Sequence, residues 1–249
     1  MLHDKTLQTR ILEGYKPKVL ILTGAGISAE SGIKTFRDSN GLWENHSIEE
    51  VATPEGFANN PDLVYRFYTQ RRAQLLNGEV SANQAHFALA KLEQYLGDEL
   101  IVVTQNVDNL HEQGGSKNVL HMHGELLSAK CCLSGEKVAG MRQLNANSRC
   151  ACCQPSSPMR PDIVWFGEIP YHMAVIEDHL YNCDIFVSIG TSGNVYPAAG
   201  FVAAASQFGA YTIELNLEPS EGASMFDEQH SGAASVLVPR FVERLLSLI

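Results

Sequence analysis

The sequence predicts an α/β fold in which helices cover both faces of a parallel, doubly wound sheet. Short apolar runs recur along the 249 residues, and each is long enough for a strand but too short for a helix. Amphipathic stretches separate these runs, which is typical of strand–helix–strand units. The first run ends in a glycine motif and later runs end in polar residues, at the sheet edge where open α/β folds bind ligands.

The expected elements follow from apolar periodicity and from the positions of proline and glycine. The expected helices are residues 5–15, a helical stretch over 48–77 with breaks at Pro54 and Pro61, residues 82–96, and a closing helix that begins at Pro239. The expected strands are residues 19–22, 100–104, 184–190, 210–216 and, as the last strand, 235–238.

Composition indicates an ordinary globular chain, with 45% hydrophobic and 18% charged residues, long enough for one large domain or a large domain that carries a small one. The net charge of −10 argues against a general nucleic-acid or anionic-membrane binder, because those partners require clustered Lys and Arg. An acidic surface suits basic protein substrates, although solubility alone explains it. The first residues lack the apolar core of a signal peptide, and no apolar run is long enough to span a membrane. We therefore expect a cytoplasmic, monomeric protein with no nucleic-acid or membrane partner.

The glycine motif after the first strand fits a dinucleotide-binding turn. Residues 24–29 read Gly-Ala-Gly-Ile-Ser-Ala, in which glycines permit a tight turn and a close approach to a pyrophosphate. Alone, the motif is equally consistent with glycines that simply connect a strand to a helix. An ordinary dehydrogenase would continue with a second strand and an acidic residue. Here residues 31–43 are polar and contain two glycines, which predicts a long loop that could cover a bound cofactor.

Residues 24–37, GAGISAESGIKTFR, resemble the opening motif of the sirtuins, the NAD-dependent protein-lysine deacylases. Further motifs follow in the family's order as far as Pro239. The resemblance implies a Rossmann-like core with a helical insertion and a small zinc-binding module. The implied boundaries are residues 1–33, 81–123 and 163–249 for the NAD-binding core, 34–80 for the insertion, and 124–162 for the zinc module.

A polar segment follows the strand at 100–104. Its Gln105-Asn106-Val107-Asp108 matches the sirtuin motif that contacts the nicotinamide and ribose of NAD. An amide and a carboxylate suit that task, because they can hold ribose hydroxyls and orient the bond to be broken. A helix cap is the plainer alternative for an Asn- and Asp-rich segment.

Two histidines, His121 and His123, lie on one face of an extended segment, so the residues alone also permit metal ligation. No third ligand follows at a familiar spacing. The His-Gly motif of the family matches His123, which the resemblance makes the general base, with His121 structural. A pKa near 6.5 suits a base, because the imidazole is then largely neutral at working pH.

The mechanism that the resemblance implies begins when the acyl-lysine oxygen attacks the ribose carbon that carries nicotinamide. After nicotinamide leaves, His123 takes a proton through the ribose hydroxyls, and free lysine and O-acyl-ADP-ribose result. Asn106 and Asp108 share this catalytic set, Phe36 shields the reactive face and Arg37 orients the cofactor. The implied NAD-binding residues are Gly24, Ala25, Gly26, Ser28, Ala29, Glu30, Ile33, Thr35, Phe36, Arg37, Trp43, Gln105, Asn106, Val107, Asp108, Gly190, Thr191, Ser192, Asn216, Leu217, Glu218 and Ala234.

Five of the six cysteines fall within residues 131–153, a polar region that needs a metal to hold it together. The sirtuin pattern is two C-x-x-C pairs. Cys150 and Cys153 form one pair, but Ser134 stands three residues after Cys131. We expect a structural zinc on Cys131, Cys150 and Cys153, and either Cys132 or Cys152 could complete four thiolates.

The substrate is expected to be an acylated lysine in an extended protein segment. Tyr68 and Arg71 lie one helical turn apart, and from spacing alone they are a half-buried tyrosine beside a solvated arginine. The resemblance instead makes Tyr-x-x-Arg, with Ala52 upstream, the mark of sirtuins that remove succinyl or malonyl as well as acetyl groups. The segment that pairs with the peptide as an added strand would include Val164, Phe166, Gly167 and Glu168.

Two other functions remain open from the sequence. One is mono-ADP-ribosyl transfer to protein with the same cofactor. The other is a non-catalytic NAD-sensing module, against which the intact Asn106, Asp108 and His123 count.

Overall fold

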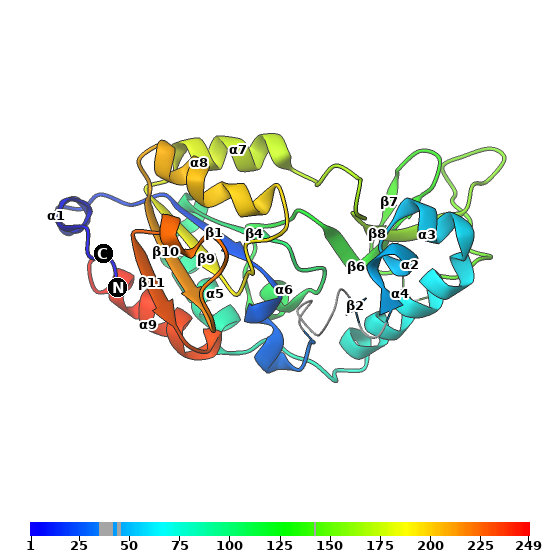
Figure 1. Ribbon diagram of the computed structural model, residues 1–249, viewed down its shortest axis with the longest axis horizontal. Coiled ribbons are helices and arrows are strands. Elements are labelled where there is room, and N and C mark those ends of the chain that lie inside the picture. The colour runs from blue at the N-terminus through cyan, green and yellow to red at the C-terminus, as the bar shows by residue number, and fades with distance from the viewer. Residues whose placement is uncertain (35–41, 44–45, 142) are drawn as a thin grey trace.

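The computed structural model describes residues 1–34, 42–43, 46–141 and 143–249. Figure 1 shows a large layered part, built on a sheet with helices above and below it, and a smaller part at the other end of the molecule. The chain enters the smaller part twice, once through α2, α3 and α4 and once through β6, β7 and β8.

The main sheet has six strands in the order β11-β10-β9-β1-β4-β5, and every neighbouring pair is parallel. The chain runs from β1 to β4 and β5 on one side and then returns to β9 on the other side of β1. The carboxyl ends of β1 and β9 therefore flank the point where the strand order reverses, which is where such sheets bind ligands. The strands are β1 (Val19–Thr23), β4 (Leu100–Thr104), β5 (Val119–His121), β9 (Ile185–Ile189), β10 (Tyr211–Asn216) and β11 (Glu228–Ser231).

Helices cover both faces of this sheet, which confirms the doubly wound prediction. Alternate side chains of β1 point to opposite faces: Ile21 packs in the core beneath α5 and α9, and Leu22 packs in the core beneath α7 and α8. The helices of this part are α1 (Lys5–Leu12), α5 (Gln84–Leu96), α6 (Leu110–Gly114), α7 (Met173–Asn182), α8 (Phe201–Gln207) and α9 (Ala234–Leu246). Short 3₁₀ turns are η1 (Ala25–Ile27), η2 (Ala29–Ser31), η3 (Gly97–Glu99), η4 (Ala198–Gly200) and η5 (Ala223–Met225).

The smaller part packs α4 against an antiparallel sheet in the order β7-β6-β8. Pro54 and Pro61 each occupy the first turn of a helix, after the N-caps Thr53 and Asn60, so they separate helices as predicted. The elements are α2 (Ile48–Val51), α3 (Pro54–Asn59), α4 (Pro61–Leu76), β6 (Gly124–Cys131), β7 (Lys137–Val138) and β8 (Met159–Ile163), with the strand pair β2 (Leu42–Trp43) and β3 (His46–Ser47) beside them.

The C-terminal part of the chain corrects one prediction. Residues 235–238, expected as the last strand, belong to α9, and the closing helix begins at Ala234 and contains Pro239. Leu237, Val238 and Phe241 are buried with the periodicity of a helix. The last strand is instead β11, whose polar sequence at the sheet edge gives no apolar signal.

Two helix ends also differ from prediction. The helix expected over 5–15 ends at Leu12, before Gly14 at φ +95°. The helix expected from residue 82 begins at Gln84, because the Asn83 side chain caps it. Within the described part of the chain, no helix is both long and apolar enough to cross a membrane.

Candidate active site and metal centre

The glycine motif after β1 lies directly against the end of β9. A Cβ atom on Gly26 would stand 2.6 Å from the Cα of Gly190, and one on Gly24 would stand 2.8 Å from the Gly190 oxygen. The Gly26 amide donates to that same oxygen at 2.8 Å. Gly190 itself has φ +62°. Glycine is therefore required here because two backbones cross in contact at the switch point of the sheet.

Ser28 joins the loop after β1 to the polar segment after β4. Its hydroxyl accepts from Asn106 Nδ2 at 3.2 Å and donates to Asp108 Oδ2 at 3.1 Å. Asn106 Nδ2 also donates to the Gly24 carbonyl at 3.2 Å. All three side chains are buried. Two motifs that are some 80 residues apart in the sequence thus form one hydrogen-bonded cluster.

Asp108 is a carboxyl group in a largely dry environment. Burial raises its pKa, and hydrogen bonds from the Leu110 amide and the Ser28 hydroxyl oppose that shift. These donors hold the carboxylate in one orientation.

Two successive backbone carbonyls at the end of β4 accept hydrogen bonds from residues 122 and 123. The Met122 amide donates to the Thr104 carbonyl, and Nδ1 of His123 lies 3.1 Å from the Gln105 carbonyl oxygen. A carbonyl can only accept, so Nδ1 of His123 carries the proton and Nε2 is left as the acceptor of the neutral ring. Burial lowers the pKa of His123, although the Gln105 contact opposes this. A half-buried neutral imidazole of fixed tautomer can serve as a general base.

Polar contacts link the ends of β4, β9 and β10. Gln105 Nε2 donates to Thr191 Oγ1 at 3.0 Å, and Asn216 Nδ2 donates to the Thr191 carbonyl at 2.7 Å. Ser192 and Leu217 are next to these residues, and Leu217 N donates to Asn216 Oδ1 at 3.1 Å. The structure thus brings the three motifs together at the carboxyl ends of these strands. The other NAD-binding candidates are spread over several elements. Ala25 and Ala29 lie in η1 and η2, Ala234 begins α9, and Glu218 is exposed. The Ile33 amide donates to the Ser28 carbonyl, and the Val107 carbonyl accepts from the Leu126 amide.

Glu30 has a partner that the sequence did not indicate. Its carboxylate accepts from Ser235 N at 2.9 Å and from Ser235 Oγ at 2.7 Å. It therefore caps the first turn of α9, whose N-cap residue Ala233 makes no side-chain hydrogen bond. Thr35, Phe36 and Arg37 lie outside the described residues, and of Trp43 the structure describes only the backbone, in β2.

The predicted substrate segment, residues 164–168, is joined to His123 by its backbone. The Val164 amide donates to the His123 carbonyl at 2.9 Å, and the Phe166 amide donates to the Ala52 carbonyl at 2.9 Å. Gly167 has φ +87°, a conformation that favours glycine. The Glu168 carboxylate accepts from Arg160 Nη2 at 2.8 and 2.6 Å, so this side chain fixes the shape of the turn. No motif in the sequence points to Arg160.

Tyr68 and Arg71 lie on α4 beside this segment. Trp165 Nε1 donates to the Tyr68 hydroxyl at 3.0 Å, and both side chains are buried. Burial raises the pKa of Tyr68, so the phenol stays protonated. The Arg71 guanidinium lies 3.4 Å above the Phe67 ring and donates to the Phe67 carbonyl at 2.7 Å. Tyr68 is therefore held by Trp165 of the predicted segment, and Arg71 is held by Phe67, one turn earlier on α4.

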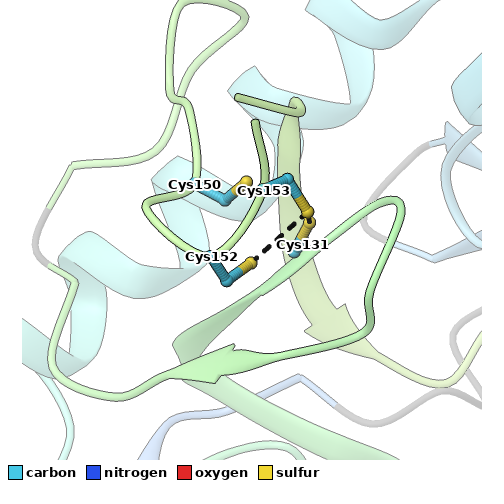
Figure 2. Close-up of side chains that lie close together, drawn as sticks. All are labelled: Cys131, Cys150, Cys152 and Cys153. Atoms are coloured by element: carbon cyan, nitrogen blue, oxygen red, sulfur yellow. Dashed lines mark hydrogen bonds between the residues drawn. The ribbon is translucent and has the colours of Figure 1, made fainter. Parts of the chain in front are cut away.

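The cysteine region forms one compact group of thiols. Among the residues that the structure describes, the Sγ atoms of Cys131, Cys150, Cys152 and Cys153 lie within 4.8 Å of one another (Figure 2). Cys131 comes from the end of β6, and the other three come from a neighbouring loop. Cys132 is exposed and is not part of the group. The structure therefore selects Cys152 over Cys132 as the possible fourth ligand.

The group fits a structural zinc ion, which tetrahedral sites bind through four cysteines. Backbone amides already point at the sulfurs: those of Leu133 and Ser134 donate to Cys131 at 3.4 Å, and that of Ser157 donates to Cys150 at 3.2 Å. Such donors stabilise thiolates around a metal. Ser134 stands where the usual pattern has a cysteine, and its Oγ lies 3.1 Å from Cys152 Sγ. Cys152 therefore supplies the fourth thiol next to the position where the pattern lacks one.

Comparison with known proteins agrees with this geometry. The model of the Sir2 family matches residues 24–197. A protein of Pasteurella multocida (strain Pm70), named NAD-dependent protein deacylase, is 58% identical over 229 residues, which cover 92% of this chain and 98% of the relative. A protein of Escherichia coli (strain K12) with the same name is 56% identical over 231 residues, covering 93% of this chain and 83% of the relative.

Solved structures give the same result. A Sir2 homologue in complex with NAD superposes with a TM-score of 0.84 at 34% identity, over 99% of this chain and 96% of the other. A Sir2 enzyme bound to a myristoylated histone peptide has a TM-score of 0.71 at 28% identity, over 98% and 96%. The match of the family model over most of the chain, the close relatives and the shared fold together place this chain in the Sir2 family.

Proposed function

We propose that this chain removes acyl groups from lysine side chains of proteins, with NAD as co-substrate. The observation that carries the proposal is the buried cluster of Ser28, Asn106 and Asp108, formed where the glycine loop meets the polar segment after β4, with His123 in the adjoining turn between β5 and β6. The names of the close relatives, NAD-dependent protein deacylase, support the same activity.

When bound, NAD supplies a ribose carbon that takes up the acyl oxygen as nicotinamide is released. The residues of this chain bind, orient and move protons around that carbon. Asn106 and Asp108 hold the ribose hydroxyls, and the Ser28 hydroxyl, which is hydrogen-bonded to both side chains, fixes their positions relative to each other. His123 accepts a proton at Nε2, because its Nδ1–H is committed to Gln105.

The lysine is presented by an extended peptide that lies along residues 164–168. Support comes from the backbone link between Val164 and His123, which places this segment next to the base. Peptides bound as added strands gain affinity from main-chain hydrogen bonds and little from sequence, so one enzyme can accept several proteins. One solved Sir2 enzyme carries a myristoylated histone peptide, which is consistent with such a substrate.

The acyl groups include acidic ones, succinyl or malonyl, together with acetyl. Arg71 is a cation fixed on α4, and Tyr68 is a phenol whose pKa is raised by burial, so it remains a donor. A cation beside a protonated phenol recognises a carboxylate. Ala52 upstream has a small side chain, which would obstruct a long acyl chain less than a larger residue at this position would.

The group of four cysteines would bind a zinc ion whose role is structural. Cys131 and the loop that carries Cys150, Cys152 and Cys153 lie in the smaller part, and α4 packs against the same β-sheet. Zinc would hold the polar loop in place, and no step of the reaction needs it.

The test is a mass-spectrometric assay of acetyl-lysine and succinyl-lysine versions of one peptide, with and without NAD. Wild-type protein is expected to free the lysine only when NAD is present and to produce nicotinamide and O-acyl-ADP-ribose in equal amounts. The variant His123→Ala is expected to free neither lysine. Consumption of NAD with ADP-ribose left on protein, and no freed lysine, would replace this proposal with ADP-ribosyl transfer.

A further inference from the structure

His121 lies two residues before the base and makes two hydrogen bonds of its own. Its Nδ1 is 3.2 Å from the backbone oxygen of Asn106, and its Nε2 is 2.8 Å from a carboxylate oxygen of Glu112. The imidazole is buried, with 8% of its side chain exposed, whereas 40% of the Glu112 side chain is exposed. The ring therefore bridges the catalytic loop after β4 and the helix α6.

Both partners of the His121 ring are acceptors. A backbone carbonyl and a carboxylate have no proton to donate, and a neutral imidazole has a single N–H. Only the doubly protonated ring satisfies both contacts. If the ring lost one proton, a nitrogen lone pair would face either the Asn106 carbonyl or the Glu112 carboxylate, and one of the two bonds would be lost.

Besides its carbonyl, Asn106 is held by the glycine loop after β1 and by the end of β4. Its side chain donates to Gly24 and Ser28, and its amide donates to Thr104 Oγ1 at 3.0 Å. We propose that the imidazolium of His121, held by Glu112, is a positioning residue that fixes the peptide plane after Asn106 and thereby the catalytic amide. In this role His121 does not touch the substrate or NAD.

The charged and titratable groups around His121 favour the imidazolium. Burial alone would lower its pKa, but the hydrogen bond and charge of Glu112 and the charge of Glu125, whose carboxylate is 4.0 Å away, outweigh burial and raise it. Asp108 on the catalytic loop also interacts favourably with a charged His121. The other titratable neighbours are His111 on α6 and His172 at the start of α7. Burial lowers the pKa of both, and a charged His121 lowers it further, so both favour the neutral form.

The first test is the protonation state of the ring, measured by long-range ¹H–¹⁵N NMR on protein labelled at histidine. At pH 6.5 both nitrogens of His121 are expected to be protonated. Glu112→Gln keeps an acceptor of the same shape without the charge, so the pKa of His121 is expected to fall in that variant. This measurement does not depend on catalysis, so it can fail or succeed independently of the proposed deacylase function.

The second test is the pH dependence of kcat for deacylation, and this arm does rest on the proposed function. Above the pKa of His121 one hydrogen bond is lost, so kcat is expected to fall on the alkaline side by about tenfold, the effect of one such bond. Glu112→Gln should move this alkaline limb to lower pH. Glu125→Gln is the matched control and should move it less, because its carboxylate is farther from the ring.

The variant His121→Gln should lower kcat about tenfold and remove the alkaline limb, with thermal unfolding used to check that it folds. A purely structural His121 would change the melting temperature without shifting the limb. Two results would overturn the proposal: a neutral His121 ring at pH 6.5, or alkaline limbs that coincide in wild type and Glu112→Gln. Both can be obtained even if His121→Gln fails to fold.

Discussion

The hydroxyl of Ser28 donates to the carboxylate of Asp108 across 3.1 Å, although the two residues are 80 positions apart in the sequence. The same hydroxyl accepts from Asn106, so it has both a donor and an acceptor role. The glycine loop after β1 and the polar segment after β4 are thereby locked to each other. The position of the loop therefore depends on Asp108, the residue that we propose holds the ribose, and this coupling can be tested.

We predict that Ser28→Ala lowers kcat/KM for deacetylation about 10- to 100-fold, because a hydrogen bond to a charged group is worth about 1.5–3 kcal/mol. Asp108 is buried, so it would lose a donor that water does not readily replace. Steady-state kinetics with an acetyl-lysine peptide measures the loss, and calorimetry of NAD binding shows how much of it is affinity.

The matched control is Ser31→Ala. Ser31 lies in the same loop, but its hydroxyl accepts at 3.0 Å from Nδ2 of Asn83, which caps α5 and lies outside the proposed catalytic set. Its kcat/KM is expected to stay within about threefold of wild type. Equal losses in the two variants would mean that the loop needs its hydroxyls for folding, and the role of Ser28 in catalysis would be withdrawn.

Most of the parallel sheet could be predicted because its central strands are buried on both faces. Such strands, β1, β4 and β9 among them, read as continuous apolar runs. The edge strand β11 is polar, so it carried no signal. The apolar cluster at residues 235–238 was misread because it is short, but Phe241, Val242 and Leu245 continue it with helical spacing.

The site could be predicted where its residues are close in sequence. Gly24 to Ser28 and Gln105 to Asp108 are contiguous motifs, and each is found at a strand end. Long-range pairs could not be predicted, because no local pattern encodes which partner a carboxylate will meet: Glu30 with Ser235, Glu168 with Arg160 and Glu112 with His121. The choice between Cys132 and Cys152 also required the fold, because Cys131 belongs to the group of four thiols and the next residue, Cys132, does not.

We predict that Glu30→Ala mainly destabilises the protein. Removing a helix cap costs about 1 kcal/mol, which for a chain of this size lowers the melting temperature by about 2–4 °C. Thermal unfolding measures the shift. A tenfold rise in KM for NAD with an unchanged melting temperature would contradict this assignment and would return Glu30 to the NAD-binding residues.

The zinc site gives a paired prediction for two neighbouring cysteine substitutions. Cys152→Ala removes one thiol of the group of four and is expected to lower the zinc content from about one per chain towards zero after dialysis against a chelator. Cys132→Ala removes an exposed thiol outside that group and is expected to leave the zinc content unchanged. Inductively coupled plasma mass spectrometry gives the stoichiometry, and thermal unfolding should follow it. Retention of zinc by the Cys152 variant would show that another residue completes the site.

Acyl specificity gives the last prediction, because two arginines of α4 differ in their surroundings. Arg71 is partly buried and stacked on Phe67, whereas Arg66 is exposed beside the groove lined by Tyr65 and Thr69. A fixed cation loses less entropy when it binds a carboxylate than a mobile one does. Arg71→Met should therefore lower kcat/KM for desuccinylation about 10- to 100-fold and leave deacetylation within about threefold.

Arg66→Met removes the same charge from the same helix, so any general effect of net charge on a succinylated peptide should appear in both variants. Competition between succinyl and acetyl forms of one peptide, followed by mass spectrometry, measures the ratio directly. If both variants lose desuccinylation equally, the carboxylate is attracted by the charge of the helix surface and not by a site. If neither loses it, the acidic acyl group is recognised elsewhere, and Tyr68 and Arg71 serve only to pack α4 against the substrate segment.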